Sequence, residues 1–239
     1  MKFLDKERLR YWNPKDFKNS VLEQEKILDV FKLLDAYWYH DGNPNNPHAE
    51  LTSGLCSNGY FNCPEVLCYP NLCEILGSQL ALKIGRKIDK HLVDIVVGSS
   101  YSDITFSYEV AKALGAIHRF AEKDKENPKM QVFKKQIPEG SNVLQVEELV
   151  TTSNTFSSVK NSIIEKNKET VSFFPYIATL VHRPPEERSY YLVNGAKIEV
   201  ISLVEKVIWA KDPSECPLCK QGSRRYRPKE NWDKLTDKE

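Results

Sequence analysis

The sequence lacks any apolar run long enough to cross a membrane. None of its hydrophobic segments approaches the roughly 18–20 consecutive apolar residues that a transmembrane helix needs. The first residues, MKFLDKERLRYWNPKD, also lack the apolar segment of a signal peptide. We therefore expect a soluble, cytoplasmic protein with no membrane partner.

The sequence also lacks an excess of either charge. Its 34 Lys and Arg residues against 33 Asp and Glu residues leave a formal net charge of +1. A nucleic-acid-binding protein usually carries a basic excess, so this balance argues against nucleic acid as a partner. The basic patch Arg224-Arg225-Tyr226-Arg227 is short, and a solvated tail explains it better. Any specificity for anions must be local.

Disulfides are not expected, although the six cysteines are an even number. Disulfide frameworks are typical of small secreted domains, and a chain of 239 residues without an export signal is neither small nor secreted. We interpret the cysteines as thiols or metal ligands. No internal repeat or low-complexity segment stands out, and the length suits one large α/β domain with appendages.

Helical and strand patterns alternate along the chain. Apolar spacing predicts one helix from Val21 to the turn at His40-Asp41-Gly42 and another over 70–89. The run LVDIVVG, followed by a helix over 104–114, forms a strand-turn-helix unit. A second strand over 143–146 leads into a helix beginning near Thr155, and PYIATLVH and KIEVISLVEKV supply two more strands. This order predicts an α/β fold: a doubly wound, mainly parallel sheet flanked by helices.

Three segments divide the chain. Residues 1–20 form a charged, aromatic arm that drapes over the body or a neighbouring subunit. Residues 21–210 form the α/β domain with a small N-terminal hood, and 211–239 form a Cys-x-x-Cys turn and a polar tail, a C-terminal extension. Within the domain, the polar stretch 121–131 (AEKDKENPKMQ) predicts a mobile loop.

The stretch VLQVEELVTTSNT, Val143 to Thr155, has the chemistry of a ligand site. Glu147 and Glu148 follow an apolar strand, and hydroxyl and amide side chains come next, where a helix begins. Free amides at a helix start form an anion cradle, and two carboxylates accept hydrogen bonds from a sugar diol. A sugar phosphate would satisfy both. The competing interpretation is an ordinary helix N-cap beside two solvated acids.

The same stretch resembles the ribose-phosphate signature of the type I phosphoribosyltransferases. Further segments resemble the orotate phosphoribosyltransferase branch in the right order: ELTSGLCSNGYFN its hood, DIVVGSSYSDITFSYEVAKALGA its diphosphate-loop strand and helix, RFAEKDKENPKM its catalytic lid, and TLVHR a strand that ends in a substrate-contacting arginine. The resemblance covers roughly residues 22–210.

The resemblance implies a role for each matching residue. Glu147 and Glu148 would hold the ribose hydroxyls of 5-phosphoribosyl 1-diphosphate, Glu148 also acting in catalysis, and Lys123 and Lys125 would lie on a lid that neutralises the leaving diphosphate. The other implied site residues are the 5-phosphate loop (Thr151, Thr152, Ser153, Asn154, Thr155), the diphosphate loop (Ser99, Ser100, Tyr101, Ser102, Asp103) and the base pocket (Tyr60, Phe61, Arg183).

The resemblance also implies the reaction and its partners. The enzyme would transfer phosphoribose to orotate or a related base, as in pyrimidine nucleotide synthesis, with Mg²⁺ bound to the diphosphate and ribose hydroxyls. Displacement at the anomeric carbon has oxocarbenium character, so the protein mainly orients the reactants and offsets charge. Because such a lid usually serves a neighbouring subunit, we expect a homodimer.

The sequence departs from the family pattern at three positions. Ser153-Asn154 replaces a Gly-Gly pair, Glu148 stands where relatives mostly have Asp, and Asp103 introduces a carboxylate into the diphosphate loop. A like-charge pair at about 4 Å costs on the order of 4 kcal/mol at an effective dielectric constant near 20. The alternative function is therefore a weakly active or non-catalytic ligand-binding or regulatory protein with the same fold.

Cys216-Pro217-Leu218-Cys219 has the spacing of a zinc knuckle. Two further ligands would be needed, and Cys63, Cys68, Cys73, His48 and His91 are available, although their spacing matches no zinc pattern. A structural Zn²⁺, reduced surface thiols and a redox pair all remain open from the sequence.

Overall fold

The computed structural model describes residues 5–99, 101–127, 131–167 and 170–236. Its helical segments are α1 (Lys6–Leu9), η1 (Pro14–Phe17), α2 (Gln24–Leu33), α3 (Cys63–Leu67), α4 (Pro70–Ile84), η2 (Lys90–Leu92), α5 (Ser102–Leu114), α6 (Asn154–Asn167), α7 (Pro217–Lys220) and α8 (Trp232–Thr236). Its strands are β1 (Tyr37–Tyr39), β2 (His48–Glu50), β3 (Cys56–Ser57), β4 (Gly59–Phe61), β5 (Ile95–Gly98), β6 (Ile117–Phe120), β7 (Glu122–Lys123), β8 (Gln131–Val132), β9 (Asn142–Val150), β10 (Ser172–His182), β11 (Tyr190–Val193), β12 (Ala196–Glu205), β13 (Ala210–Lys211) and β14 (Arg225–Tyr226).

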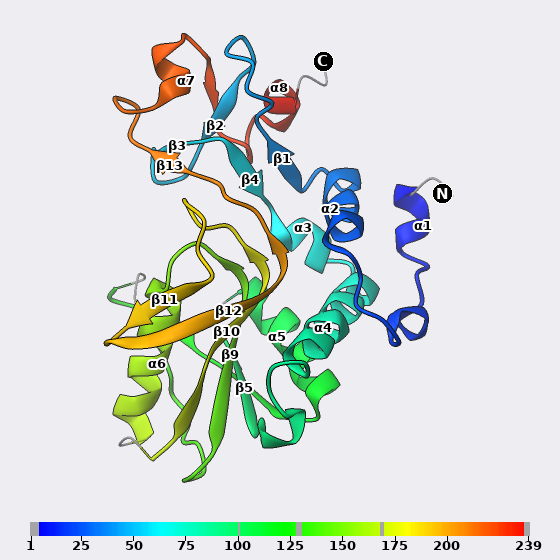
Figure 1. Cartoon of the computed structure of the whole chain (residues 1–239), viewed down its shortest axis with the longest axis vertical. Helices are drawn as coiled ribbons and strands as arrows, with labels where there is room; N and C mark the ends of the chain where they lie inside the picture. Colours follow the sequence, from blue (N-terminus) through cyan, green and yellow to red (C-terminus); the bar gives the residue numbers. More distant parts are fainter. Residues whose placement is uncertain (1–4, 100, 128–130, 168–169, 237–239) are drawn as a thin grey trace.

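A six-stranded sheet in the order β11-β12-β10-β9-β5-β6 forms the centre of the molecule (Figure 1). Every neighbouring pair is parallel except β11 with β12. Helices α2, α4 and α5 cover one face and α6 covers the other. The expected doubly wound, mainly parallel α/β fold is confirmed.

The alternation of side chains along β5 explains why both faces are covered. Val96 packs with Phe106 and Val110 of α5 in the main core. Its neighbours Ile95 and Val97 point to the other face, where they pack with Val159 and Ile163 of α6 in a smaller cluster. Because successive side chains of a strand point to opposite faces, a run of apolar residues requires a helix on each side.

The strand order reverses between β5 and β9. From β5 the chain passes through α5 to β6 at one edge, and it then returns to β9 on the other side of β5 before continuing through α6 to β10. In open parallel sheets, ligands bind beyond the carboxyl ends of the strands at such a reversal. The two loops at this place are 99–101 and 151–153.

Gly98 permits the close approach of α5 to the end of β5. A Cβ atom at this position would lie 2.2 Å from Ser107 Oγ and 3.1 Å from the carbonyl oxygen of Asp103. Only glycine therefore fits at the end of this strand without moving the helix.

Smaller elements form a hood at the upper end of the molecule (Figure 1). Strands β1 and β4 pair with each other, and β2 and β3 belong to a four-stranded sheet in the order β13-β3-β2-β14. Two strands of that sheet, β13 and β14, come from the C-terminal segment, which also carries α7 and α8. The described part of this segment thus packs on the hood.

The N-terminal arm lies along α4. Asn71 of α4 donates hydrogen bonds from Nδ2 to the carbonyl oxygens of Leu9 and Trp12, and Gln79 Nε2 donates to that of Phe17. Leu9 is fully buried. The arm therefore drapes over the body of its own chain. The assignment of arm, domain and tail as separate segments stays a prediction, and residues 1–4 and 237–239 lie outside the described residues.

Several expected boundaries were wrong. The first helix ends at Leu33 rather than continuing to His40, and the aromatic residues Tyr37–Tyr39 form β1 instead. The second ends at Ile84, before Gly85. The expected loop over 121–131 contains the paired strands β7 and β8, and its residues 128–130 lie outside the described residues. Among the described residues, no helix has the length and apolar character needed to span a membrane.

Candidate functional site

Two loops and the end of a third strand meet at the carboxyl edge of the sheet. Loop 99–101 joins β5 to α5, loop 151–153 joins β9 to α6, and Arg183 follows β10 directly. The backbone amide of Arg183 donates to the carbonyl oxygen of Val150 at 2.8 Å, which ties the end of β10 to the end of β9.

The loop expected to hold a 5-phosphate is open to solvent. Thr152 and Asn154 are exposed, while Thr151, Ser153 and Thr155 are partly buried. Neither Ser153 nor Asn154 has a positive φ, so the residues that replace Gly-Gly adopt ordinary backbone geometry. The loop leads into α6, a helix of 14 residues whose first amides face this edge.

The buried side chains of Tyr191 and His182 hold the first residue of this loop. Tyr191 Oη donates to the carbonyl oxygen of Thr151 at 2.9 Å, and it lies 3.0 Å from His182 Nε2. Burial lowers the pKa of His182 to about 4, so its imidazole is neutral at pH 7. Because the one Tyr191 hydroxyl proton goes to Thr151, His182 Nε2 carries the ring proton and donates to Tyr191 Oη. Thr151 is therefore held by the sheet rather than by the helix.

Glu147 lies inside the protein, away from the open loop. Its side chain is 3% exposed and its Oε1 accepts a hydrogen bond from Gln145 Nε2 at 3.0 Å. Burial is the main cause that raises the pKa of Glu147 to about 8. The expected role of Glu147 in holding the ribose stays a prediction; in this structure its carboxyl group is buried and paired with Gln145.

Glu148 points to the other face of β9 and remains at the site. It is partly buried, and its charge influences the pKa values of Tyr60, Cys63 and Asp103. The backbone amide of Glu148 donates to Asp103 Oδ1. Glu148 is thus the acid that lies between the base-pocket candidates and the diphosphate loop.

Asp103 is turned into the protein rather than toward solvent. The side chain is 6% exposed, and its second carboxylate oxygen accepts a hydrogen bond from Ser99 Oγ. Burial, together with the charges of Glu148 and Glu147, raises the pKa of Asp103 well above its usual range. A carboxyl group that is buried and hydrogen-bonded to Ser99 and to the Glu148 amide is directed into the protein, away from an incoming diphosphate.

The diphosphate loop and the expected lid touch each other. Tyr101 is exposed and has a φ of 67°, a rare conformation for a residue with a side chain. Lys123 of β7 places its Nζ 4.7 Å from the centre of the Tyr101 ring. Lys125 is exposed on the same hairpin. Ser100 lies outside the described residues, as does the side chain of Ser102.

The base-pocket candidates separate into two groups. Tyr60 is half-buried. Burial raises the pKa of its hydroxyl, and the charges of Arg183 and Glu148 act on this pKa in opposite directions. Arg183 is partly buried, and its Nε has no hydrogen-bond partner within the described structure. Phe61, by contrast, is 5% exposed and packs against Phe31 and Tyr37 in the core. Its ring supports the hood rather than facing a ligand.

Relatives in the curated proteins match almost their whole length. No protein-family model matches the chain. Orotate phosphoribosyltransferase of Thermoanaerobacter sp. (strain X514) is 30% identical over 207 residues, covering 87% of this chain and 97% of the relative. That of Pelotomaculum thermopropionicum is 34% identical over 209 residues, again covering 87% and 97%. This chain belongs to the type I phosphoribosyltransferase family.

Solved structures agree on the fold of this phosphoribosyltransferase. Orotate phosphoribosyltransferase from Aeropyrum pernix superposes with a TM-score of 0.56 at 18% identity, covering 75% of this chain and 93% of that one. The enzyme from Mycobacterium tuberculosis, in complex with Fe(III) dicitrate, gives 0.50 at 16% identity, covering 74% and 94%.

A groove of about 990 Å³ opens beside the loop that joins β9 to α6. Its lining includes Ser153, Tyr39, Arg188 and Lys206. Glu148, Tyr60 and Arg183 are not part of that lining, so the groove lies next to the candidate site rather than over it.

A separate cluster of metal-ligating side chains lies in the hood. His48, Cys56, Cys216 and Cys219 bring their ligand atoms within 4.8 Å of one another. The spacing of Cys216 and Cys219 predicted a ligand pair, and His48 was among the available further ligands. Cys56 was not among them. No spacing rule could have found Cys56, because strand pairing in the hood brings it to residues that are far away along the chain.

Proposed function

We propose that this phosphoribosyltransferase transfers phosphoribose from 5-phosphoribosyl 1-diphosphate to orotate or a closely related base. The observation that carries the proposal is Arg183. A guanidinium that is largely removed from solvent and keeps an unpartnered Nε donor has lost hydrogen bonds to water without replacing them all. A planar carboxylate, such as that of orotate, would supply the missing acceptor.

The neighbours of Arg183 suit a flat base. Tyr60 carries an aromatic ring, and its hydroxyl lies close enough to Arg183 and Glu148 for both charges to act on its pKa. Glu148 would hold the ribose hydroxyls or the Mg²⁺ that the diphosphate carries. Mg²⁺ prefers carboxylate oxygens as protein ligands. Glu147 does not suit this role, since it is buried against Gln145.

The remaining parts would act on the two phosphate groups. The open loop 151–155 at the start of α6 would receive the 5-phosphate through backbone amides and hydroxyls. In the transfer, a base nitrogen forms a bond to the anomeric carbon while the bond to the diphosphate oxygen breaks. The diphosphate leaves with that electron pair and takes up the proton that the base nitrogen loses. Lys123 and Lys125 would offset its charge when the lid closes. Mg²⁺ would supply further charge stabilisation.

Two measurements on the wild-type protein test the proposal. The melting temperature is expected to rise with 5-phosphoribosyl 1-diphosphate and Mg²⁺, because a ligand that binds only the folded state stabilises it. Orotate absorbance is then expected to change with time. A thermal shift without turnover would favour the alternative, a ligand-binding protein of the same fold. The absence of any shift at millimolar ligand would contradict both functions.

A variant pair tests the base pocket. We expect Arg183→Gln to raise the KM for orotate about 10- to 100-fold, because a charge-assisted hydrogen bond to a carboxylate is lost. Arg188→Gln is the control, since Arg188 is more exposed and pairs with Glu186. Equal KM values for the two variants would contradict the role of Arg183.

We also propose a homodimer, which light scattering would detect as twice the chain mass.

A further inference from the structure

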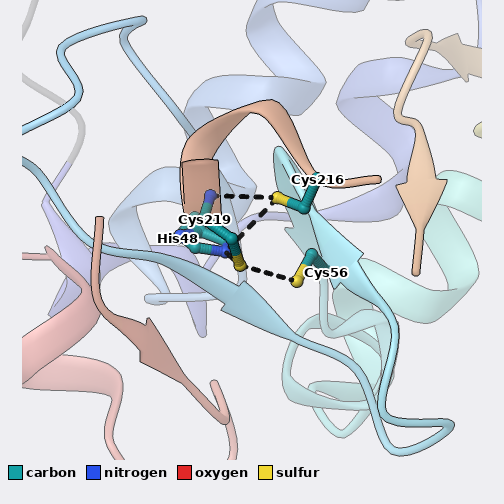
Figure 2. A group of neighbouring side chains, drawn as sticks. All are labelled: His48, Cys56, Cys216 and Cys219. Carbon is teal, nitrogen blue, oxygen red and sulfur yellow. Dashed lines mark hydrogen bonds between the residues drawn. The ribbon is translucent and has the colours of Figure 1, made fainter. Parts of the chain in front are cut away.

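Four side chains from three distant segments meet in the hood (Figure 2). His48 comes from β2, Cys56 from β3, and Cys216 and Cys219 from the turn that begins α7. His48, Cys56 and Cys216 are fully buried, and Cys219 is partly buried. The three cysteines are not joined by disulfides.

The distances within the cluster are those of ligands around one metal ion. His48 Nε2 lies 3.6 Å from Cys216 Sγ and 3.4 Å from Cys219 Sγ, and Cys56 Sγ lies 3.5 Å from Cys219 Sγ. Tetrahedral zinc with its usual bond lengths separates sulfur from nitrogen by about 3.5 Å and sulfur from sulfur by about 3.8 Å. The four ligand atoms therefore need little movement to surround Zn²⁺.

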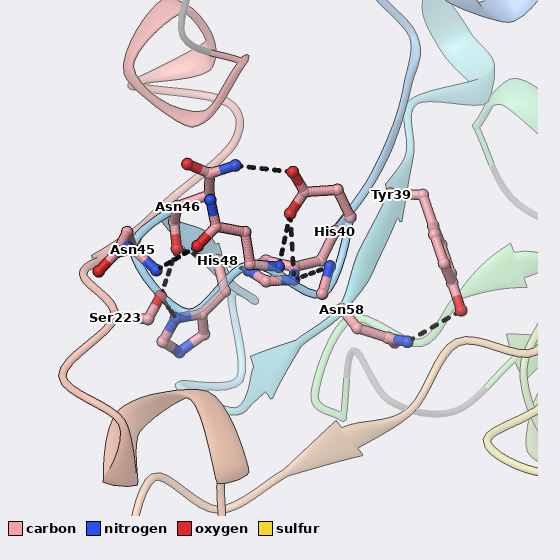
Figure 3. Close-up of polar contacts among 10 residues, drawn as sticks. Tyr39, His40, Asn45, Asn46, His48, Asn58 and Ser223 are labelled. Carbon is pink, nitrogen blue, oxygen red and sulfur yellow. Dashed lines mark hydrogen bonds and ion pairs between the residues drawn. The ribbon is translucent and has the colours of Figure 1, made fainter.

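Hydrogen bonds around the cluster prepare His48 as a ligand (Figure 3). Ser223 Oγ donates to the carbonyl oxygen of Asn46 at 2.7 Å, so this hydroxyl can accept from His48 Nδ1, which lies 2.8 Å away. With its proton on Nδ1, the imidazole presents the lone pair of Nε2 to the three sulfurs. Such outer hydrogen bonds orient metal-binding histidines.

The turn between Cys216 and Cys219 is also shaped for a thiolate. The backbone amide of Cys219 donates to Cys216 Sγ at 3.4 Å. An amide directed at a sulfur stabilises negative charge on it, as is needed when the sulfur binds a metal ion.

We propose that His48, Cys56, Cys216 and Cys219 bind one Zn²⁺ in a structural Cys₃His site that fastens the C-terminal segment to the hood. Four protein ligands leave no open position for a water or substrate, which distinguishes a structural from a catalytic zinc site. Three thiolates and one imidazole favour zinc over Mg²⁺, which prefers oxygen ligands. The proposal does not depend on transferase activity.

The zinc would strengthen an attachment that otherwise rests on short strand pairs, polar contacts and a small apolar cluster. Strands β13 and β14 each pair with the hood through two residues. The apolar cluster beneath them contains little besides the cysteines, Leu218 and Trp209. Zinc binding provides folding free energy directly in small elements that cannot bury a sufficient core.

Metal analysis of the wild-type protein tests the proposal first. The full chain, produced without a polyhistidine tag and purified without chelator, is expected to contain about one Zn²⁺ per chain. Replacement by Co²⁺ should give the visible absorption of tetrahedral cobalt with a thiolate charge-transfer band. These measurements need no variant, so they remain decisive if substitutions impair folding.

Variants then identify the ligands. Cys219→Ser is expected to abolish stoichiometric zinc, and Ser223→Ala is expected to lower zinc affinity about 10- to 100-fold, since it removes the partner of His48 Nδ1. Cys68→Ser is the control, because Cys68 is exposed and lies outside the cluster. It should retain full zinc.

Hydrogen exchange tests what the metal holds. Removing zinc with a chelator should increase amide exchange in residues 216–236 much more than in β9 or β10. A wild-type protein without zinc, a Cys56–Cys219 disulfide in place of the metal, zinc loss in Cys68→Ser, or unchanged exchange after zinc removal would each overturn the proposal.

Discussion

Glu147 and Glu148 are neighbours in the sequence but lie on opposite sides of β9. The sequence suggested that both acids follow the strand and share one ligand. In the structure the strand continues to Val150, because β10 pairs with it through Glu147 and Leu149. Residues inside a strand alternate between its faces, so only one of two adjacent acids can face the site. The length of a strand depends on its partner, which the local sequence does not reveal.

The buried position of Glu147 predicts a pH-dependent stability. Below about pH 4.5 the carboxyl group is protonated in both states, but between that pH and about 8 it ionises only in the unfolded chain. The free energy of unfolding therefore falls as pH rises through this window. We expect Glu147→Gln to escape that loss and to be more stable than the wild type by about 2–4 kcal/mol at pH 9.

Urea denaturation at pH 5 and pH 9 measures this effect. The advantage of Glu147→Gln should be large at pH 9 and small at pH 5. Glu165→Gln, an exposed substitution on α6, is the control and should track the wild type at both values. A variant that is equally or less stable than the wild type at pH 9 would show that Glu147 ionises normally.

Asp103 is the second residue whose environment in the structure differs from the one that the sequence predicts. In the sequence it opposes diphosphate, whereas in the structure it accepts hydrogen bonds from Ser99 and from the backbone of Glu148. We expect Asp103→Asn, which keeps the shape, to leave the KM for 5-phosphoribosyl 1-diphosphate within about threefold of the wild type, because the side chain is buried and directed into the protein. Initial rates at pH 7 measure this. A tenfold decrease in KM would mean that the carboxylate repels the substrate after all.

At the scale of elements, the central strands and helices could be predicted and the edges could not. Strand β5 and helix α5 carry clear apolar patterns, and both were placed correctly within a few residues. Strands β6 and β11 were missed because each lies at an edge of the sheet and exposes half or more of its residues. An edge strand needs only one apolar face, so four residues give too little pattern.

The hairpin of β7 and β8 is the element expected to move during the reaction. Lys123 rests near the ring of Tyr101 and Lys134 pairs with Glu122, so the two lysines have different surroundings on one element. We expect Lys123→Gln to lower kcat about 100-fold, because one charge that stabilises the leaving diphosphate is lost. The KM for orotate should change little.

Steady-state kinetics with Lys134→Gln as the control tests the lid. Lys134 pairs at the surface, where such an ion pair contributes little, and its variant should keep kcat within about threefold of the wild type. Equal losses in both variants would mean that the hairpin acts through its overall charge rather than through Lys123.

At the scale of the whole molecule, the C-terminal segment connects the proposed zinc site to the proposed base pocket. Beyond α7 and β14 the chain forms α8, where the Trp232 ring lies 6.3 Å from that of Tyr60. Tyr60 is the proposed wall of the base pocket. The sequence contains every residue of this connection, but a polar tail gives no sign that it returns across the hood.

This connection predicts that zinc affects the base more than the phosphates. If zinc holds the C-terminal segment, chelation releases Trp232 and frees the Tyr60 ring, while loop 151–155 keeps its anchor through Tyr191. An aromatic contact contributes about 0.5–1.5 kcal/mol, so the KM for orotate should rise about 2- to 10-fold on zinc removal. Trp232→Ala with zinc bound should give the same increase.

The thermal shift by 5-phosphoribosyl 1-diphosphate should persist in both cases, because its site does not depend on the segment. An unchanged KM for orotate after zinc loss would mean that the segment and the pocket are independent. If 5-phosphoribosyl 1-diphosphate no longer raised the melting temperature after zinc loss, the metal would support the entire fold.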